Sequence, residues 1–228
     1  MRKYFVLAGV LLLMAGVALA QGEFPTVETS PAFMFIRTNL NLNNAFVVQN
    51  PIAGDPPIDI TGANKFNCAG GGGTIAYNLT SMLGIAADMG GCKFFGNTVG
   101  LGNKISGNQF TYLFGPRLTF RSSSPFQPFF ELGFGGDRVS ITCQSGQTAC
   151  QNATGGNTYS RNAFAMSVGG GFDIKLSKKI SLRPAQLEYL YTRFGNQCAL
   201  QVCNNNANQN SFRLKSGIVI AWGGSASK

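Results

Sequence analysis

The 228-residue sequence contains no histidine and little charge. Without histidine, a catalytic triad with an imidazole base is excluded, and so is a zinc site with an imidazole ligand. Charged residues make up only 12% of the chain, which is about half the usual share in a soluble domain. Such a composition argues against a helical soluble enzyme, which would carry more glutamate and lysine. A disordered chain is also excluded, because disorder combines low hydrophobicity with dense charge.

The beginning of the chain has the organisation of a secretory signal peptide. Arg2 and Lys3 precede an apolar run from Tyr4 to Val17, and Ala18–Ala20 supplies the small residues of a cleavage site. The apolar run is shorter than the about 20 residues of a transmembrane helix. We therefore predict three parts, namely a signal peptide at 1–20, a short N-terminal segment at 21–30 and one folded domain at 31–228.

The rest of the chain lacks an apolar run long enough for a membrane helix and instead alternates with a period of two. From Phe110 to Phe120, aromatic and apolar residues occupy one face, whereas the other face holds mainly small residues and single charges. The segments 126–134, 164–175 and 212–222 repeat this pattern. A glycine-rich face with isolated charges suits the narrow interior of a closed barrel better than the solvent face of a soluble sandwich. The aromatic face is typical of a wall in contact with lipid.

Eight segments show this alternation, and the connections between them differ in length. Three connections are tight (79–81, 122–125 and 176–179), and four are long and polar (41–66, 93–107, 139–161 and 195–209). Short turns at one end and long loops at the other are typical of outer-membrane barrels. We predict an all-β fold, an eight-stranded antiparallel up-and-down transmembrane β-barrel with short periplasmic turns and long extracellular loops. Its strands lie near residues 31–40, 67–78, 82–92, 108–121, 126–138, 162–175, 180–194 and 210–222.

Six cysteines indicate an oxidising compartment. Their spacing suggests local pairs that staple the long loops at the outer end of the barrel, but six cysteines allow several connectivities, so the pairing stays open. A thiolate metal site is disfavoured because no C-x-x-C pair is present. We therefore predict no metal and no cofactor. The predicted disulfide cysteines are Cys68, Cys92, Cys143, Cys150, Cys198 and Cys203.

Three stretches, 114–120, 162–194 and 211–222, resemble the OmpA-like outer-membrane β-barrel family. The resemblance covers most of the mature chain, and it implies an eight-stranded barrel with both chain ends in the periplasm. It does not imply a particular activity, since family members include structural proteins, adhesins and narrow channels.

The closing strand also resembles the signal that the barrel-assembly machinery reads during biogenesis. Lys215, Gly217 and Trp222 match this signal, whereas Ile220 stands where an aromatic residue is preferred. The resemblance therefore implies the assembly machinery as a partner.

The isolated charges on the predicted inner face are the sharpest candidate site. An unpaired charge in a narrow barrel is costly, so we expect acids and bases to pair across the interior. Such a network can be a structural plug or a narrow ion path, and two carboxylates can also perform acid–base chemistry. The predicted acids are Asp88, Glu131, Asp173 and Glu188, and the predicted bases are Arg117, Arg121, Lys175, Arg213 and Lys215.

These observations predict a non-catalytic outer-membrane protein with a structural or surface-interaction role. We expect outer-membrane lipids and lipopolysaccharide as its surroundings, and the long loops as the site of a surface ligand. Nucleic-acid binding is disfavoured because the basic residues are scattered singly. Two alternatives stay open, a small diffusion channel and a soluble secreted β-barrel that binds an apolar ligand.

Overall fold

The computed structural model describes residues 24–39, 66–95, 98–99, 103–143, 158–194, 197–199, 202–204 and 208–223. The predicted signal peptide lies outside these residues. In the described part of the chain, no helix has the length and hydropathy to cross a membrane. The strands are β1 (Val27–Asn39), β2 (Phe66–Asn78), β3 (Leu83–Phe95), β4 (Thr98–Val99), β5 (Asn103–Thr119), β6 (Phe126–Cys143), β7 (Thr158–Lys175), β8 (Ile180–Arg193), β9 (Gln197–Ala199), β10 (Val202–Asn204) and β11 (Asn208–Trp222).

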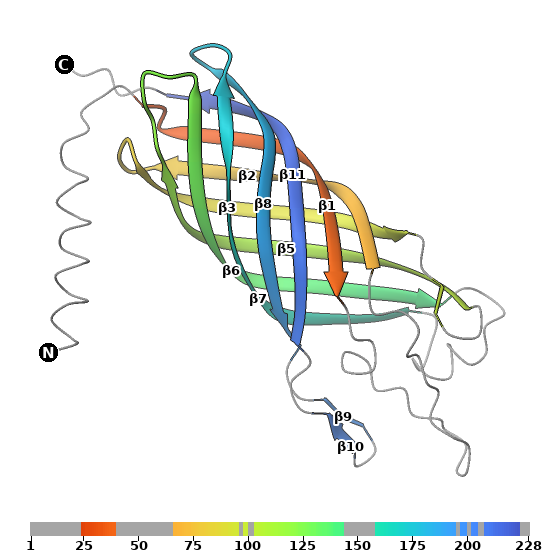
Figure 1. Cartoon of the computed structure of the whole chain (residues 1–228). Helices are drawn as coiled ribbons and strands as arrows, with labels where there is room; N and C mark the ends of the chain where they lie inside the picture. The colour runs from red at the N-terminus through yellow and green to blue at the C-terminus, as the bar shows by residue number, and fades with distance from the viewer. Residues whose placement is uncertain are drawn as a thin grey trace, which may run out of the picture.

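Eight long strands close into an antiparallel barrel (Figure 1). Around the wall the order is β1, β2, β3, β5, β6, β7, β8 and β11, and the pairing of β11 with β1 completes the ring. Closure leaves no strand edge unpaired, so the backbone amides of the wall are satisfied without water. The short β4 pairs with β5, and β9 pairs with β10 in the connection between β8 and β11. The predicted eight-stranded antiparallel barrel is confirmed.

The barrel has two unlike ends, which we call the turn end and the loop end. The turn end holds the three tight connections, at 79–82, 120–125 and 176–179, and β1 begins and β11 ends there (Figure 1). In the first turn, Thr80 Oγ1 accepts hydrogen bonds from the backbone N–H groups of Met82 and Leu83, at 3.2 and 2.9 Å. The loop end is where the long connections leave the wall.

Several strands are longer than the alternation predicts. At the loop end β5 begins at Asn103, β6 continues to Cys143 and β7 begins at Thr158. At the turn end β1 begins at Val27, inside the predicted N-terminal segment 21–30. Apolar alternation reports the surroundings of the side chains, whereas a strand continues as long as its backbone is paired. The hydrophobic pattern therefore underestimates the length of the wall.

The two faces of the wall differ in chemistry. The inner face buries polar and charged side chains, whereas the outer face exposes large apolar ones. A soluble barrel that binds an apolar ligand would show the reverse distribution, so this alternative does not fit the structure. The exposed apolar side chains include Phe33, Ile85, Phe114, Phe134, Leu187 and Ile218.

A glycine in the wall makes room for one of the interior charges. Gly169 in β7 lies directly opposite Glu188 in β8, and a Cβ atom at Gly169 would lie 2.6 Å from Cγ of Glu188. No real Cβ approaches a carbon this closely. The absence of a side chain at Gly169 therefore lets Glu188 turn into the barrel.

Candidate functional site

The middle of the barrel interior holds a central cluster of two acids and two bases, Asp88 from β3, Glu188 from β8, and Arg213 and Lys215 from β11. Arg213 contacts both acids, with Nη2 at 2.8 Å from Asp88 Oδ1 and Nε donating to Glu188 Oε2. Lys215 Nζ also contacts both, at 2.5 Å from Asp88 Oδ2 and 3.3 Å from Glu188 Oε1. All four side chains are almost fully buried. Each charge contacts two charges of opposite sign, which compensates for its burial.

Neutral side chains from the surrounding wall complete the central cluster. Thr74 Oγ1 donates to Asp88 Oδ2 at 2.8 Å, and Gln186 Nε2 donates to Glu188 Oε1 at 2.7 Å. Arg213 Nη1 donates to Thr111 Oγ1 at 2.9 Å. Because β3 and β8 lie on opposite sides of the ring, the chain of contacts through Arg213 crosses the interior from wall to wall.

A second cluster, the turn-end cluster, lies between the central cluster and the turn end. It consists of Arg117 from β5, Phe129 from β6, Asp173 from β7 and Arg183 from β8. Asp173 binds both arginines: Arg183 Nε and Nη2 donate at 2.7 and 3.0 Å, and Arg117 Nη2 donates at 3.2 Å. Both guanidiniums also lie over the Phe129 ring, with Cζ at 4.2 Å and 4.3 Å from its centroid. Cation–π attraction is strongest where water is excluded, as it is at these buried residues.

Glu28 extends the turn-end cluster to β1. Arg121 Nη2 donates to Glu28 Oε1 at 2.8 Å, and Arg121 Nη1 donates to the backbone carbonyl of Ser81 at 2.5 Å. Arg117 Nη2 lies 3.9 Å from Glu28 Oε2. These contacts tie β1 and the first turn to the arginines of the interior.

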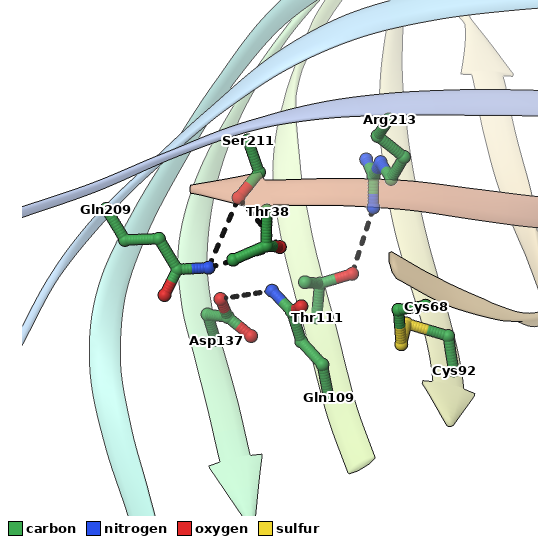
Figure 2. The surroundings of a disulfide bond; sticks show 9 residues. All are labelled: Thr38, Cys68, Cys92, Gln109, Thr111, Asp137, Gln209, Ser211 and Arg213. Carbon is green, nitrogen blue, oxygen red and sulfur yellow. Dashed lines mark hydrogen bonds between the residues drawn. A yellow bond between two sulfur atoms is a disulfide. The ribbon is translucent and has the colours of Figure 1, made fainter. Parts of the chain in front are cut away.

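The interior near the loop end is held mainly by hydrogen bonds from uncharged donors rather than by ion pairs. Asp137 Oδ2 in β6 accepts from Gln109 Nε2 at 2.7 Å and from Thr192 Oγ1 at 3.0 Å. Across the interior, Gln209 Nε2 donates to the hydroxyls of Ser211 and Thr38, at 3.2 and 3.4 Å. Figure 2 shows five of these side chains in one shared interior space, namely Gln109, Asp137, Gln209, Ser211 and Thr38.

A disulfide joins Cys68 of β2 to Cys92 of β3, with their Cα atoms 5.4 Å apart (Figure 2). Both residues are buried, and they lie on neighbouring strands inside the wall. The predicted local pairing of these two cysteines at the loop end is therefore confirmed. The bond joins two paired strands of the wall rather than loop residues, so it locks β2 to β3 near the loop end.

The other predicted cysteines are only partly described. Cys143 is the last residue of β6 rather than a loop residue, and Cys150 lies outside the described residues. Cys198 in β9 lies directly opposite Cys203 in β10 in the ladder of their hairpin. Whether these four cysteines form bonds stays a prediction.

Two of the predicted interior charges lie apart from the ion pairs. Glu131 is buried and lies opposite Arg117 in the ladder, but it joins none of the ion pairs among the described residues. Lys175 is exposed at the turn end and does not enter the network, contrary to its prediction. It is the last residue of β7, two positions beyond Asp173, and the interior opens to the outside at this level.

Alternation alone misses Arg183, which holds Asp173. Counting back by two from Glu188 places Arg183 on the outer face. The structure has a β-bulge here. Three steps along β8, from Arg183 to Gln186, match two steps along β11. Three steps from Leu182 to Ala185 match two steps along β7. Because of the bulge, the side chains of Arg183 and Gln186 both point into the interior. The sequence signal for it is Pro184, since proline within a sheet is found mainly at edges and bulges.

Two further interior acids lie at positions that the prediction left out. Glu28 precedes the predicted first strand, and Asp137 continues the inner face of β6, on which Glu131 already lies. Extending the period of two beyond the apolar stretch would have found both.

A cavity of about 350 Å³ opens at the turn end. It is lined by Glu28, Arg121, Asp173, Lys175 and Lys178, among others. Glu28 and Asp173 are also members of the turn-end cluster, so the ion pairs form the inner limit of this cavity. Within the described part of the chain, no three potential metal ligands come together.

The residues of the predicted assembly signal have separate places in the wall. Lys215 belongs to the central cluster, and Gly217 lies opposite Ala32 of β1, at the seam that closes the barrel. Trp222 is exposed on the outer face at the turn end, and its indole N–H donates to Thr29 Oγ1 at 3.1 Å.

Comparison with known proteins agrees with this architecture. The fold resembles that of Neisserial surface protein A, with a TM-score of 0.54 and 12% identity over 89% of this chain and all of that chain. Weaker likenesses are found to Ail, the attachment invasion locus protein of Yersinia pestis (TM-score 0.45, 12% identity, 86% of this chain and 99% of that chain), and to OprG from Pseudomonas aeruginosa (0.42, 14%, 87% and 96%). The shared fold rests on the first of these alone. No curated protein sequence matches the chain.

The family is shown by the sequence match itself. Residues 5–217 match the outer membrane protein beta-barrel domain, which covers nearly the whole chain. The closed antiparallel wall, the apolar outer face and the polar interior agree with a transmembrane β-barrel. The chain belongs to the outer membrane protein beta-barrel domain family.

Proposed function

We propose that this protein is a closed, non-catalytic outer-membrane barrel that holds its long connections at the cell surface. In this proposal the turn end faces the periplasm and the loop end faces outward, in the arrangement usual for such barrels. The barrel is an anchor, and surface interaction is the task of the connections at the loop end.

The observation that carries this proposal is the two clusters of ion pairs across the interior, which Gln186 joins by hydrogen bonds to Arg183 and Glu188. The central cluster crosses the lumen from β3 to β8, and the turn-end cluster fills the level below it. Removing a buried partner of an ion pair typically costs about 3–5 kcal/mol. A channel for solutes would require these contacts to open, which argues against conduction. The two acids of the central cluster are engaged by bases, which argues against a role in proton transfer.

The outer wall supports the proposed location. Phe33, Phe164 and Phe212 are 59%, 53% and 67% exposed, which in water would be a strong aggregation hazard. In a bilayer the same side chains contact acyl chains. Outer-membrane lipids and lipopolysaccharide are therefore the proposed surroundings, and the barrel-assembly machinery is the proposed partner that reads Lys215, Gly217 and Trp222 during insertion.

Site-specific epitope insertion tests the proposal. One variant carries an epitope in the connection between β6 and β7 (residues 144–157), and a matched variant carries it in the tight turn at Ser122–Ser124. We expect antibody labelling of intact cells only for the first variant, and labelling of both after the outer membrane is permeabilised. Heat-dependent migration in electrophoresis verifies that both variants are folded. Labelling of the tight-turn variant on intact cells would contradict the proposed orientation.

A further inference from the structure

The charges of the described residues are sorted between the two faces of the barrel. Every acidic side chain that the structure describes lies in the buried interior, and the set consists of Glu28, Asp88, Glu131, Asp137, Asp173 and Glu188. On the described outer wall near the loop end the charged residues are basic, namely Arg37, Lys93, Arg138 and Arg193, and all of them are exposed. The outer surface therefore carries a belt of basic residues at one level of the barrel.

The three arginines of this belt share the same neighbour on the wall. Each lies directly opposite a phenylalanine of an adjacent strand, and directly opposite residues point to the same face of a sheet. These phenylalanines are among the exposed apolar residues of the outer wall. The pairs are Arg37 with Phe212, Arg138 with Phe110, and Arg193 with Phe164.

On its other side, each arginine lies opposite an asparagine. Asn67 of β2 faces Arg37, Asn162 of β7 faces Arg138, and Asn208 of β11 faces Arg193. Each outer position therefore presents a ring, a guanidinium and an amide in one row across three strands. We call these three sets the Phe–Arg–Asn rows.

The level of the rows fits the edge of a hydrocarbon layer. In β6, Arg138 lies twelve positions beyond Phe126, the first exposed apolar residue of the strand at the turn end. At about 3.3 Å per residue and a tilt of about 40°, this separation is roughly 30 Å along the barrel axis. The hydrocarbon core of a bilayer is about 30 Å thick. The arginines therefore lie at the headgroups of the outer leaflet when the barrel has the proposed orientation.

The three groups of each row match three parts of one class of lipid. A guanidinium binds phosphate through paired, charge-assisted hydrogen bonds. A phenylalanine ring at this depth contacts acyl chains, and an asparagine amide both donates to and accepts from sugar hydroxyls. A glycerophospholipid would use the guanidinium and the ring but would leave the amide without a sugar.

We propose that the Phe–Arg–Asn rows bind a phosphorylated glycolipid of the outer leaflet, with the arginine on a phosphate and the asparagine on the sugar beside it. This inference rests on the proposed membrane orientation. It adds a defined lipid site on the outer wall to the proposed anchoring role.

Lipid titration of the refolded full-length mature protein in neutral detergent tests the proposal. The probes are diphosphorylated lipid A, the same lipid A with both phosphates removed, and phosphatidylglycerol. We expect diphosphorylated lipid A to bind at least about tenfold more tightly than either other lipid. Equal binding of the first two would overturn the role of phosphate. Equal binding of phosphatidylglycerol would overturn the assignment to a glycolipid.

Two triple variants with equal loss of charge locate the site. R37Q/R138Q/R193Q removes the belt, whereas K175Q/K178Q/K179Q removes three exposed charges at the turn end. We expect the first variant to lose at least about tenfold in affinity for diphosphorylated lipid A and the second to keep it. Equal losses in both variants, or no loss in the first, would overturn the proposal.

Conservative variants separate binding from folding. R37K/R138K/R193K keeps the charge but loses the fork of donors, so we expect intermediate affinity. Should the glutamine variant fail to fold, which heat-dependent migration reveals, the lysine variant and the comparison of the three lipids still decide the outcome. Epitope labelling is independent of lipid binding, so a failed orientation and a failed lipid site give different results.

Discussion

The two halves of the barrel interior are held together by different chemistry. Toward the turn end, three arginines form ion pairs with Glu28 and Asp173, and two of these arginines also lie over Phe129. The central cluster continues this pattern with two further bases and two further acids. Toward the loop end, hydroxyl and amide groups bind Asp137 and one another, and a disulfide locks the wall.

The difference shows how a narrow barrel can be filled in two ways. Ion pairs fix the geometry strongly, but each depends on every partner being present, since a buried charge without its partner is costly. Neutral hydrogen bonds tolerate the loss of one partner at lower cost. Stability should therefore depend on single residues in the turn-end half and on the covalent bond in the loop-end half.

Substitution of Arg213 should lower the stability of the barrel more than any other change considered below. Arg213→Leu leaves Asp88 and Glu188 with Lys215 alone, so we expect the free energy of unfolding to fall by about 3–5 kcal/mol. Urea unfolding in lipid vesicles, followed by the fluorescence of the single Trp222, measures this change. Lys178→Leu in the exposed turn at 176–179 is the control, with an expected change within about 0.5 kcal/mol. Equal effects of the two substitutions would contradict the importance of the central cluster.

Loss of the disulfide should have the next largest effect. Cys68 and Cys92 are 24 positions apart, and releasing a closed loop of this length lowers the free energy of unfolding by about 3 kcal/mol. The same unfolding experiment on C68A/C92A measures it. Reduction of the unsubstituted protein should approach the same midpoint. An unchanged midpoint for the double variant would show that the hydrogen bonds suffice to hold the loop-end half.

Replacement of the interior aromatic ring should have a moderate effect. Phe129→Leu keeps an apolar side chain but removes the ring beneath the guanidiniums of Arg117 and Arg183, and we expect a loss of about 2 kcal/mol. Phe114→Leu, on the outer wall, is the matched control and should change the free energy of unfolding by less than about 1 kcal/mol. A larger loss for Phe114→Leu would mean that lipid contact outweighs cation–π attraction.

Neutralising the acid of the loop-end half should have the smallest effect. Asp137→Asn keeps the shape of the side chain and its neutral partners Gln109 and Thr192, so we expect a change within about 1 kcal/mol. Asp173→Asn is the same substitution in the turn-end half. It leaves Arg117 and Arg183 without their shared carboxylate and should lower the free energy of unfolding by about 3 kcal/mol or more. Similar values for the two variants would remove the distinction between the halves.

Period-two alternation was sufficient to predict the eight strands and the inward direction of Asp88, Glu188, Arg213 and Lys215. It failed where the period or the environment changes. A bulge separates Arg183 from Glu188 and shifts the period by one residue, and Lys175 lies where the interior opens to the turn-end cavity. The partners of each charge depend on strands far apart in the sequence, such as β3 and β11, so alternation along one strand could not reveal them.

Conductance in a planar bilayer tests the central claim most directly. The mature protein, shown to be folded by its heat-dependent migration, is inserted into the bilayer. The current is then recorded in a salt solution at neutral pH. The account predicts no regular current steps, because ion pairs fill the interior at the central and turn-end levels. Reproducible steps of one size from the unsubstituted protein would contradict it and assign the barrel to the small channels.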